Sequence, residues 1–254
     1  MKILLVSTSD LKGGAAIAAS RLHQGLQQIG VESTMLVQSK VGDDPRVIGD
    51  SSKIQKGLAN IRPTLDTLPL NFYQQRDRTP YNYSIQWLPN RVLSAINQID
   101  ADVINLHWIC GGFLPIETIA KLNKPIVWTL HDMWAFTGGC HYAGECTKYT
   151  QRCGNCPLLQ SHREKDLSRW IWQRKAKAWQ NLPLKIVTPS KWLAECAQNS
   201  SLFAQQEIVA IPNGIDIQQY KINWSMVKSE LGIDSPTPLE PLSLRKTSLK
   251  EIGQ

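Results

Sequence analysis

The chain has 254 residues, of which 42% are hydrophobic and 19% are charged, and its formal net charge at pH 7 is +7. This length exceeds one typical domain but falls short of two full α/β domains, and the composition excludes the disordered and fibrous classes. The positive charge predicts anionic partners such as nucleotide diphosphates, lipid phosphates or nucleic acid. The sequence has no long basic run that would favour one of these partners over the others.

The first residues predict a strand rather than an export signal. Residues 2–7 (KILLVS) are a continuous apolar run, and Asp10, Lys12 and Gly13 follow at once without a small-residue cleavage site. No run approaches 18 apolar residues, so we expect no membrane-spanning segment. We therefore expect a cytoplasmic protein whose six cysteines stay reduced.

Predicted strands and helices alternate along most of the chain. An alanine-rich helix that ends at Gly30 separates the first strand from the second, TMLVQ. This βαβ opening implies a parallel sheet with right-handed crossovers. Further strands are expected at 103–109, 125–132, 184–188 and 207–211, and helices at 113–122, 163–181 and after Ser190. The fold class is therefore predicted to be α/β, a doubly wound Rossmann-like parallel sheet.

The domain organisation follows from where this alternation fails. Residues 50–100 read as helices joined by polar loops that hold the prolines of that region, and residues 134–160 read as an irregular segment. We expect one Rossmann-like domain over 1–218 with a cysteine-rich loop at 138–158. Residues 219–254 are expected to form a linker helix and an irregular, truncated tail.

The residues that follow the first strand suit a phosphate group. Lys12, Gly13 and Gly14 lie between a strand and a helix, where free N–H groups and the positive helix end favour an anion. A tight turn that needs φ > 0 explains the glycines equally well. The fingerprint G-x-G-x-x-G is absent, which counts against a nicotinamide enzyme. Ser190 and Asn213 also follow strands, so we add them as ligand-binding candidates.

His107 and His131 each end an apolar strand, in NLHW and TLHD. A lone histidine at such a place is more often structural than catalytic, but two on neighbouring strands favour a shared cleft. Asp132 is placed to orient or charge one of them. We therefore predict that these three residues are catalytic.

Four cysteines, Cys140, Cys146, Cys153 and Cys156, fall within 17 residues of one another. Four thiolates in a glycine-containing loop can close a tetrahedral zinc site, although the spacing of the first pair is wider than usual. Buried reduced thiols and a redox pair are the alternatives. We favour structural zinc, because a long irregular loop otherwise has little to hold it together.

The predicted helix at 163–181 carries Trp172, Ala176 and Trp179 on one side, with arginines and lysines around them. A basic amphipathic helix of this kind can lie on an anionic membrane surface. An apolar stripe more often faces the core, and we favour that interpretation. The remaining cysteines, Cys110 and Cys196, are expected to be small buried side chains.

Several phrases together resemble the N-terminal half of bacterial family 4 glycosyltransferases, which have the GT-B fold and build exopolysaccharide or other surface glycans. These phrases are KILLVSTSDLKGGAAIAASRL, VINLHWICGGFLP, PIVWTLHDMWAFTGGCHY, CGNCP, VTPSKWL and IPNGID. The resemblance covers residues 1 to about 232. It implies two Rossmann-like domains across a cleft, with the acceptor on the N-terminal domain and the nucleotide sugar on the C-terminal one.

The resemblance also implies roles for individual residues. It matches Gly13 and Gly14 with the glycines that approach the donor diphosphate, and His107 with a histidine that contacts the transferred sugar. His131 and Asp132 match the next strand-end pair in the same cleft. Asn213 matches the start of the interdomain segment.

The implied function is retaining transfer of a sugar from a nucleotide sugar to a hydroxyl of a lipid-linked or growing glycan. No catalytic metal is expected. The family's second domain has no counterpart after residue 234, so we expect a truncated enzyme with weak activity when it is alone. A separate chain would then supply the second domain. We also expect some contact with the inner face of the membrane. The alternative is a non-catalytic glycan-binding or partner-binding remnant, and a zinc-bearing nucleic-acid binder ranks last.

Overall fold

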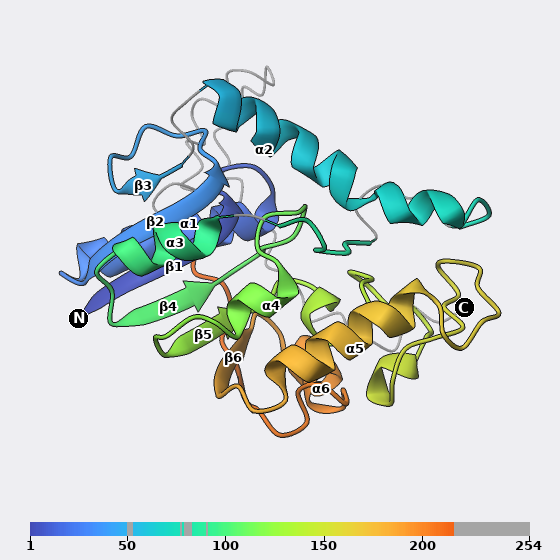
Figure 1. Cartoon of the computed structure of the whole chain (residues 1–254). Helices are drawn as coiled ribbons and strands as arrows, with labels where there is room; N and C mark the ends of the chain where they lie inside the picture. The colour runs from blue at the N-terminus through green and yellow to red at the C-terminus, as the bar shows by residue number, and fades with distance from the viewer. Residues whose placement is uncertain (50–52, 77, 79–82, 90, 216–254) are drawn as a thin grey trace, which may run out of the picture. The chain divides into compact units, whose positions relative to one another are not determined.

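The computed structural model of the protein describes residues 1–49, 53–76, 78, 83–89 and 91–215 (Figure 1). The chain divides into two compact units, Met1–Gly214 and Ile215–Gln254. The predicted linker helix and tail at 219–254 lie outside the described residues.

The first unit is built on one sheet of seven parallel strands in the order β3-β2-β1-β4-β5-β6-β7. The strands are β1 (Lys2–Ser9), β2 (Glu32–Ser39), β3 (Val47–Ile48), β4 (Val103–Leu106), β5 (Ile126–Thr129), β6 (Leu184–Thr188) and β7 (Glu207–Ala210). The order reverses between β1 and β4, and ligands of such sheets bind at the carboxyl ends of the strands at that point. The doubly wound Rossmann-like α/β class expected for the N-terminal half of a GT-B fold is confirmed.

Helices connect the strands as a parallel sheet requires (Figure 1). They are α1 (Gly14–Gln28), α2 (Lys53–Asp66), α3 (Val92–Gln98), α4 (Ile116–Ile119), α5 (Leu167–Trp179) and α6 (Lys191–Gln198). Three short 3-10 helices accompany them: η1 (Leu68–Phe72), η2 (Trp134–Phe136) and η3 (Lys148–Thr150). None of the helices in the described part of the chain is long and apolar enough to cross a membrane.

The helix ends follow the capping signals of the sequence. Gly30 has φ 76° just beyond α1, a left-handed conformation that glycine adopts without steric cost. The hydroxyl of Ser190 accepts a hydrogen bond from the Leu193 N–H at 3.2 Å and so caps α6. Both predicted helix boundaries are confirmed.

The core packs aromatic side chains from distant segments against the sheet. Trp128 of β5 lies 5.2 Å from Trp179 of α5 and 6.1 Å from Phe203, measured between ring centroids. Trp134 lies 6.4 Å from both tryptophans. The core-facing interpretation of α5 is confirmed for Trp179, which is buried, but Trp172 and Ala176 are only half-buried, and Ile171 and Lys175 lie on the buried face instead.

Several predicted boundaries were wrong. The strand predicted at 103–109 ends at Leu106, so His107 is the first residue beyond β4, and the helix predicted at 113–122 is the single turn α4. Pro63 lies inside α2 rather than in a loop. A proline inside a helix removes one backbone hydrogen bond, which tertiary packing must offset. The ring of Pro63 packs close to Gly111, within 3.6 Å of where a side chain on that glycine would begin.

Candidate active site

The turn between β1 and α1 presents free backbone to open space. Gly13 has φ 97° and precedes the first residue of α1, and no side chain caps this end or places an acidic group in its first turn. A Cβ atom on Gly13 or Gly14 would meet nothing within 4 Å. The positive end of a 15-residue helix is therefore open to an anion.

Asp10 holds this turn against the loop that follows β2. Its carboxylate is buried and accepts hydrogen bonds from the N–H groups of Leu11 at 3.0 Å, Val41 at 2.8 Å and Gly42 at 2.8 Å. A buried carboxylate with several donors fixes the backbone around it. Asp10 was not among the predicted site residues, and its only signal in the sequence is its place just after the strand.

The turn after β1 is tied to the loop after β4. Thr8 donates its N–H to the carbonyl of Trp108 at 2.8 Å, and its hydroxyl donates to the carbonyl of Cys110 at 3.0 Å. The two loops therefore flank the point where the strand order reverses. This is where the sequence predicted that glycines and histidines would meet.

His107 and His131 form a pair. His107 Nδ1 lies 2.9 Å from His131 Nε2, and the rings stack with centroids 5.2 Å apart. His107 is only 3% exposed and its Nε2 has no partner among the described residues, whereas His131 is partly exposed. The predicted proximity of the two histidines is confirmed, and His131 is the one that a ligand can reach.

Both imidazoles are neutral at physiological pH. Burial, with a smaller contribution from the neighbouring His131, lowers the pKa of His107 to about 3. Burial also lowers the pKa of His131 to about 4, against the opposing effect of Asp132. A neutral pair shares one proton along the short N···N contact, so it can offer a hydrogen bond to a ligand without carrying charge.

Asp132 orients a histidine, but one that was not predicted. Its carboxylate contacts His141 Nδ1 at 2.6 Å and accepts hydrogen bonds from Trp108 Nε1 at 2.8 Å and from the Trp134 N–H at 2.8 Å. His141 Nε2 in turn lies 2.9 Å from the hydroxyl of Ser84. The imidazole that contacts Asp132 is thus that of His141, which lowers the pKa of the Asp132 carboxyl despite its burial.

A small cavity of about 10 Å³ lies within this group. His107, Trp108, His131 and Asp132 line it together with Ile109, Cys110, Trp128, Leu130, Trp134 and Ala135. The three predicted catalytic residues therefore lie around one space. That space is too small for a sugar as it stands.

Lys175 of α5 is fully buried behind the same loop. Its ammonium donates to the carbonyl of Trp134 and, at 3.0 Å, to that of Thr137, and it lies 3.7 Å from the centroid of the Trp134 ring. Burial lowers the pKa of Lys175 to about 7. A basic residue within the inward face of α5 was not predicted, because helical spacing alone cannot show which lysine has carbonyl partners inside.

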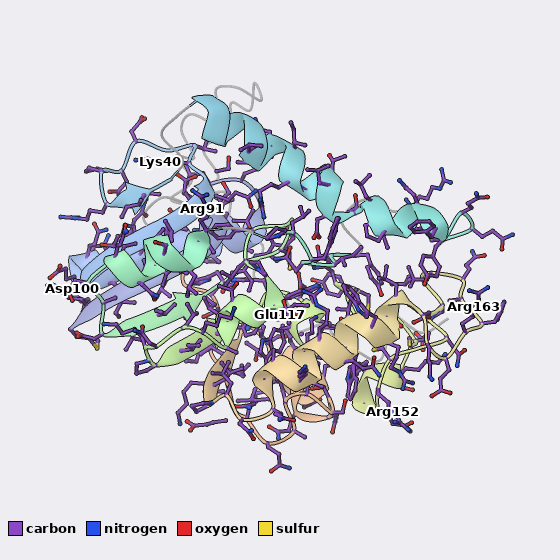
Figure 2. The ribbon with its side chains drawn as sticks, viewed as in Figure 1. Lys40, Arg91, Asp100, Glu117, Arg152 and Arg163 are labelled. Atoms are coloured by element: carbon purple, nitrogen blue, oxygen red, sulfur yellow. The ribbon has the colours of Figure 1, made fainter. Side chains whose placement is uncertain are left out.

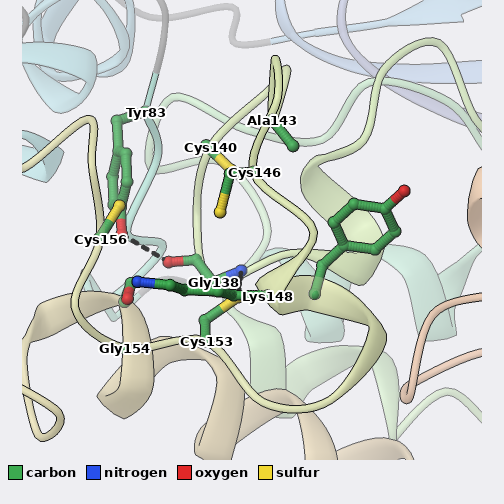
Figure 3. A pocket seen from close by; sticks show the side chains of 11 residues that line it. Tyr83, Gly138, Cys140, Ala143, Cys146, Lys148, Cys153, Gly154 and Cys156 are labelled. Atoms are coloured by element: carbon green, nitrogen blue, oxygen red, sulfur yellow. Dashed lines mark hydrogen bonds between the residues drawn. The ribbon is translucent and has the colours of Figure 1, made fainter.

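The four cysteines of the loop at 138–158 line one small cavity of about 20 Å³ (Figure 3). The Gly138 N–H donates to Cys153 Sγ at 3.1 Å, and burial raises the pKa of Cys140 to about 12 and of Cys153 to about 11. Among the residues that the structure describes, no three His, Cys, Asp or Glu side chains are placed to hold a metal ion together. None of the six cysteines forms a disulfide in this structure, and zinc binding stays a prediction.

The contacts of Ser190 and Asn213, the two other predicted ligand-binding residues, differ from those of the histidine pair. Ser190 uses its hydroxyl to cap α6, and Asn213 is exposed beyond β7. Asp216, the next acidic residue of that segment, lies outside the described residues. Contact of Ser190 and Asn213 with a ligand stays a prediction.

Comparison with known proteins agrees with this geometry. The sequence model described as Glycosyltransferase Family 4 matches residues 12–219. The chain is also 25% identical over 240 residues to a protein of Escherichia coli (strain K12) whose name gives it as a colanic acid biosynthesis glycosyl transferase, WcaC. That alignment covers 85% of this chain and 55% of the relative, so the chain spans about half the length of that protein.

The family match includes β1's turn, the histidine pair and the cysteine-rich loop, and therefore most of the first unit. It coincides with a sheet whose strand order reverses between β1 and β4, the point at which ligands of such sheets bind. The chain belongs to glycosyltransferase family 4.

Proposed function

We infer that this chain takes part in glycosyl transfer, with a nucleotide sugar as donor and a hydroxyl of a lipid-linked or growing glycan as acceptor. The observation that carries this inference is the pairing of an open helix end at Gly13 and Gly14 with the neutral histidine pair. Family membership supports the reaction class. The whole reaction, including its retention of configuration, is part of the proposal.

The donor diphosphate would bind at the N-terminal end of α1. The uncapped N–H groups there and the absence of an acidic side chain in the first turn favour a doubly charged group. Lys12 is exposed beside them and adds positive charge. As the bond between the anomeric carbon and the diphosphate breaks, these groups would stabilise the departing oxyanion.

His131 would contact the transferred sugar. It is the exposed member of the pair, and His107 behind it fixes its ring orientation through the 2.9 Å contact. In a front-face substitution the acceptor oxygen bonds to the anomeric carbon on the side from which the diphosphate leaves, and the acceptor proton passes to the departing phosphate oxygen. A neutral imidazole suits this step, because it donates a hydrogen bond to a sugar hydroxyl without removing that proton.

The test is release of nucleoside diphosphate from a panel of nucleotide sugars in the presence of a polyprenyl-phosphate-linked acceptor. We expect His131→Ala to lower this release by at least about 100-fold, because the group that orients the sugar is lost. His162→Ala, at an exposed histidine of the segment before α5, is the control and should keep full release. Product NMR should show the anomeric configuration of the donor, and equal release from His131→Ala and from His162→Ala would contradict the proposal.

A further inference from the structure

A chain of hydrogen bonds lies beside the histidine pair and ends at Trp108. The Ser84 hydroxyl lies 2.9 Å from His141 Nε2, and His141 Nδ1 lies 2.6 Å from Asp132 Oδ2. The same carboxylate oxygen accepts a hydrogen bond from Trp108 Nε1 at 2.8 Å. Because a carboxylate only accepts hydrogen bonds, His141 Nδ1 carries a proton that it donates to Asp132. Side chains from segments far apart in the sequence are therefore joined end to end.

Trp134 ties the two ends of this chain together. Its backbone N–H donates to Asp132 Oδ1 at 2.8 Å, and its indole N–H donates to the carbonyl of Ser84 at 2.9 Å. Trp134, Ser84 and His141 are all buried, and the carbonyl of His141 accepts a hydrogen bond from the Met133 N–H at 2.8 Å. A buried network whose members are hydrogen-bonded to one another holds each of them in one orientation.

The carboxylate of Asp132 is occupied by donors of the protein itself. Burial raises the pKa of this carboxyl, but the contact with His141 and the hydrogen bonds from Trp134 and Trp108 lower it overall. A carboxylate stabilised in its charged form by several donors is a weak base. These contacts therefore favour a role for Asp132 in orienting its neighbours over the catalytic role expected from the sequence.

Trp108 is the member of the chain that opens on the histidine pair. It is half-buried, follows His107 at the carboxyl end of β4, and lines the same cavity as the partly exposed His131. Its ring lies 5.6 Å from that of His141 between centroids, so one wall of the indole is fixed from behind. An aromatic ring next to a polar group suits a sugar, whose C–H groups pack on the ring while its hydroxyls form hydrogen bonds at the edge.

We propose that a sugar ring stacks on the half-buried indole of Trp108, beside His131. Asp132, His141 and Ser84 are then positioning residues that fix the plane of this indole. The sugar would lie over the ring and outside the small cavity, so the volume of that cavity does not limit it. The proposal rests on the proposed function and deepens it, because it names the surface that holds the sugar.

The first test is saturation-transfer NMR of the purified full chain with a panel of methyl hexopyranosides. We expect transfer to the ring C–H protons of at least one glycoside. Trp108→Leu should lower this transfer by at least about fivefold, because leucine is apolar but has no flat ring. Trp170→Leu, which removes an exposed indole of α5, is the matched control and should give the same transfer as the parent chain.

The second test separates positioning from a merely structural role, and it uses two replacements of His141. An asparagine amide nitrogen takes the place of Nδ1 and keeps a donor to Asp132, whereas a glutamine amide takes the place of Nε2 and keeps only the contact with Ser84. His141→Gln should therefore weaken glycoside binding by at least about fivefold and shift the indole N–H resonance of Trp108, and His141→Asn should restore both. The resonance is assigned by its loss in Trp108→Leu.

Circular dichroism should show that all variants are folded. Equal glycoside binding by His141→Asn and His141→Gln, with the indole resonance in the same place, would overturn the positioning role. Absence of saturation transfer to every glycoside in the parent chain, or equal transfer in Trp108→Leu, would overturn the stacking surface.

These outcomes are separable from that of the proposed function, because glycoside binding needs neither a donor diphosphate nor turnover. Transfer that Trp108→Leu removes would uphold the stacking surface even if no nucleoside diphosphate were released. Release of nucleoside diphosphate that Trp108→Leu leaves unchanged would overturn the stacking surface and leave the proposed function standing.

Discussion

Replacing Lys175 with methionine is expected to lower the free energy of unfolding by about 3 kcal/mol, because two buried carbonyl groups lose the amine that donates hydrogen bonds to them. Methionine fills a similar volume, so the loss reflects the missing hydrogen bonds and the missing contact with the Trp134 ring rather than a cavity. Lys177→Met, at an exposed position of the same helix, should change stability by less than about 0.5 kcal/mol. Urea unfolding of the three proteins at pH 7 measures both changes.

The pH dependence of the same measurement distinguishes a buried amine from a merely well-packed side chain. The folded pKa of Lys175 is about 7 and the unfolded value is higher, so the unfolded state binds more protons between pH 7 and 9. The free energy of unfolding of the parent chain should therefore rise with pH across this window relative to that of Lys175→Met, by roughly 2 kcal/mol. A constant difference between the two proteins would show that Lys175 stays fully charged in the fold.

Acidification is expected to destabilise the fold through the histidine pair. The folded pKa of His107 is about 3, well below its unfolded value near 6.5, so the unfolded state takes up a proton first as the pH falls. The stability contributed by the neutral ring is complete above about pH 6.5 and is lost progressively down to about pH 3. Between pH 7 and 4.5 this single residue should account for about 2 kcal/mol of lost stability.

His107→Gln tests this expectation, because glutamine keeps polar atoms but does not titrate. Its free energy of unfolding should fall less between pH 7 and 4.5 than that of the parent chain, by about 2 kcal/mol. His162→Gln, at an exposed position, should leave the slope unchanged. Parallel pH curves for all three proteins would show that the pKa of His107 does not differ between the folded and unfolded states.

The sequence predicted the parallel sheet well, because buried strands of this kind are short, continuous apolar runs with glycine or proline between them. The run at 184–188 coincides with β6 residue for residue. The sequence could not predict the two-residue β3 or the length of the single turn α4, because neither is long enough to show a hydrophobic period. Pro63 was assigned to a loop because local propensity disfavours it in α2, and packing near Gly111 overrides that preference.

The candidate site was only partly predictable. Strand-end position was enough to bring His107 and His131 together, because parallel strands end at one edge of the sheet. It could not show that Asp132 pairs with His141, which lies nine residues further along in the irregular segment. Buried charged residues such as Lys175 cannot be recognised from the neighbouring sequence, because their hydrogen-bond partners come from distant parts of the chain.

The sequence also could not predict ion pairs between residues that are distant along the chain. Figure 2 places Glu117 on α4 next to α5, where its carboxylate forms an ion pair with Arg174 at 2.7 Å. Arg174 also donates to the carbonyls of Ile85 and Gln86 and so connects α5 to the segment that holds Trp87. No spacing in the sequence relates these residues, which lie 57 and 88 or more positions apart.

Binding of the donor at the turn between β1 and α1 is the central claim, and calorimetric titration with nucleotide sugars tests it most directly. Gly14→Val adds a side chain into open space at the proposed phosphate site, and Gly25→Val adds the same side chain into open space further along the same helix. We expect the parent chain and Gly25→Val to bind a nucleotide sugar with similar affinity and Gly14→Val to bind it at least about tenfold more weakly. Equal affinity of the two variants, or no binding by the folded parent chain, would contradict the account.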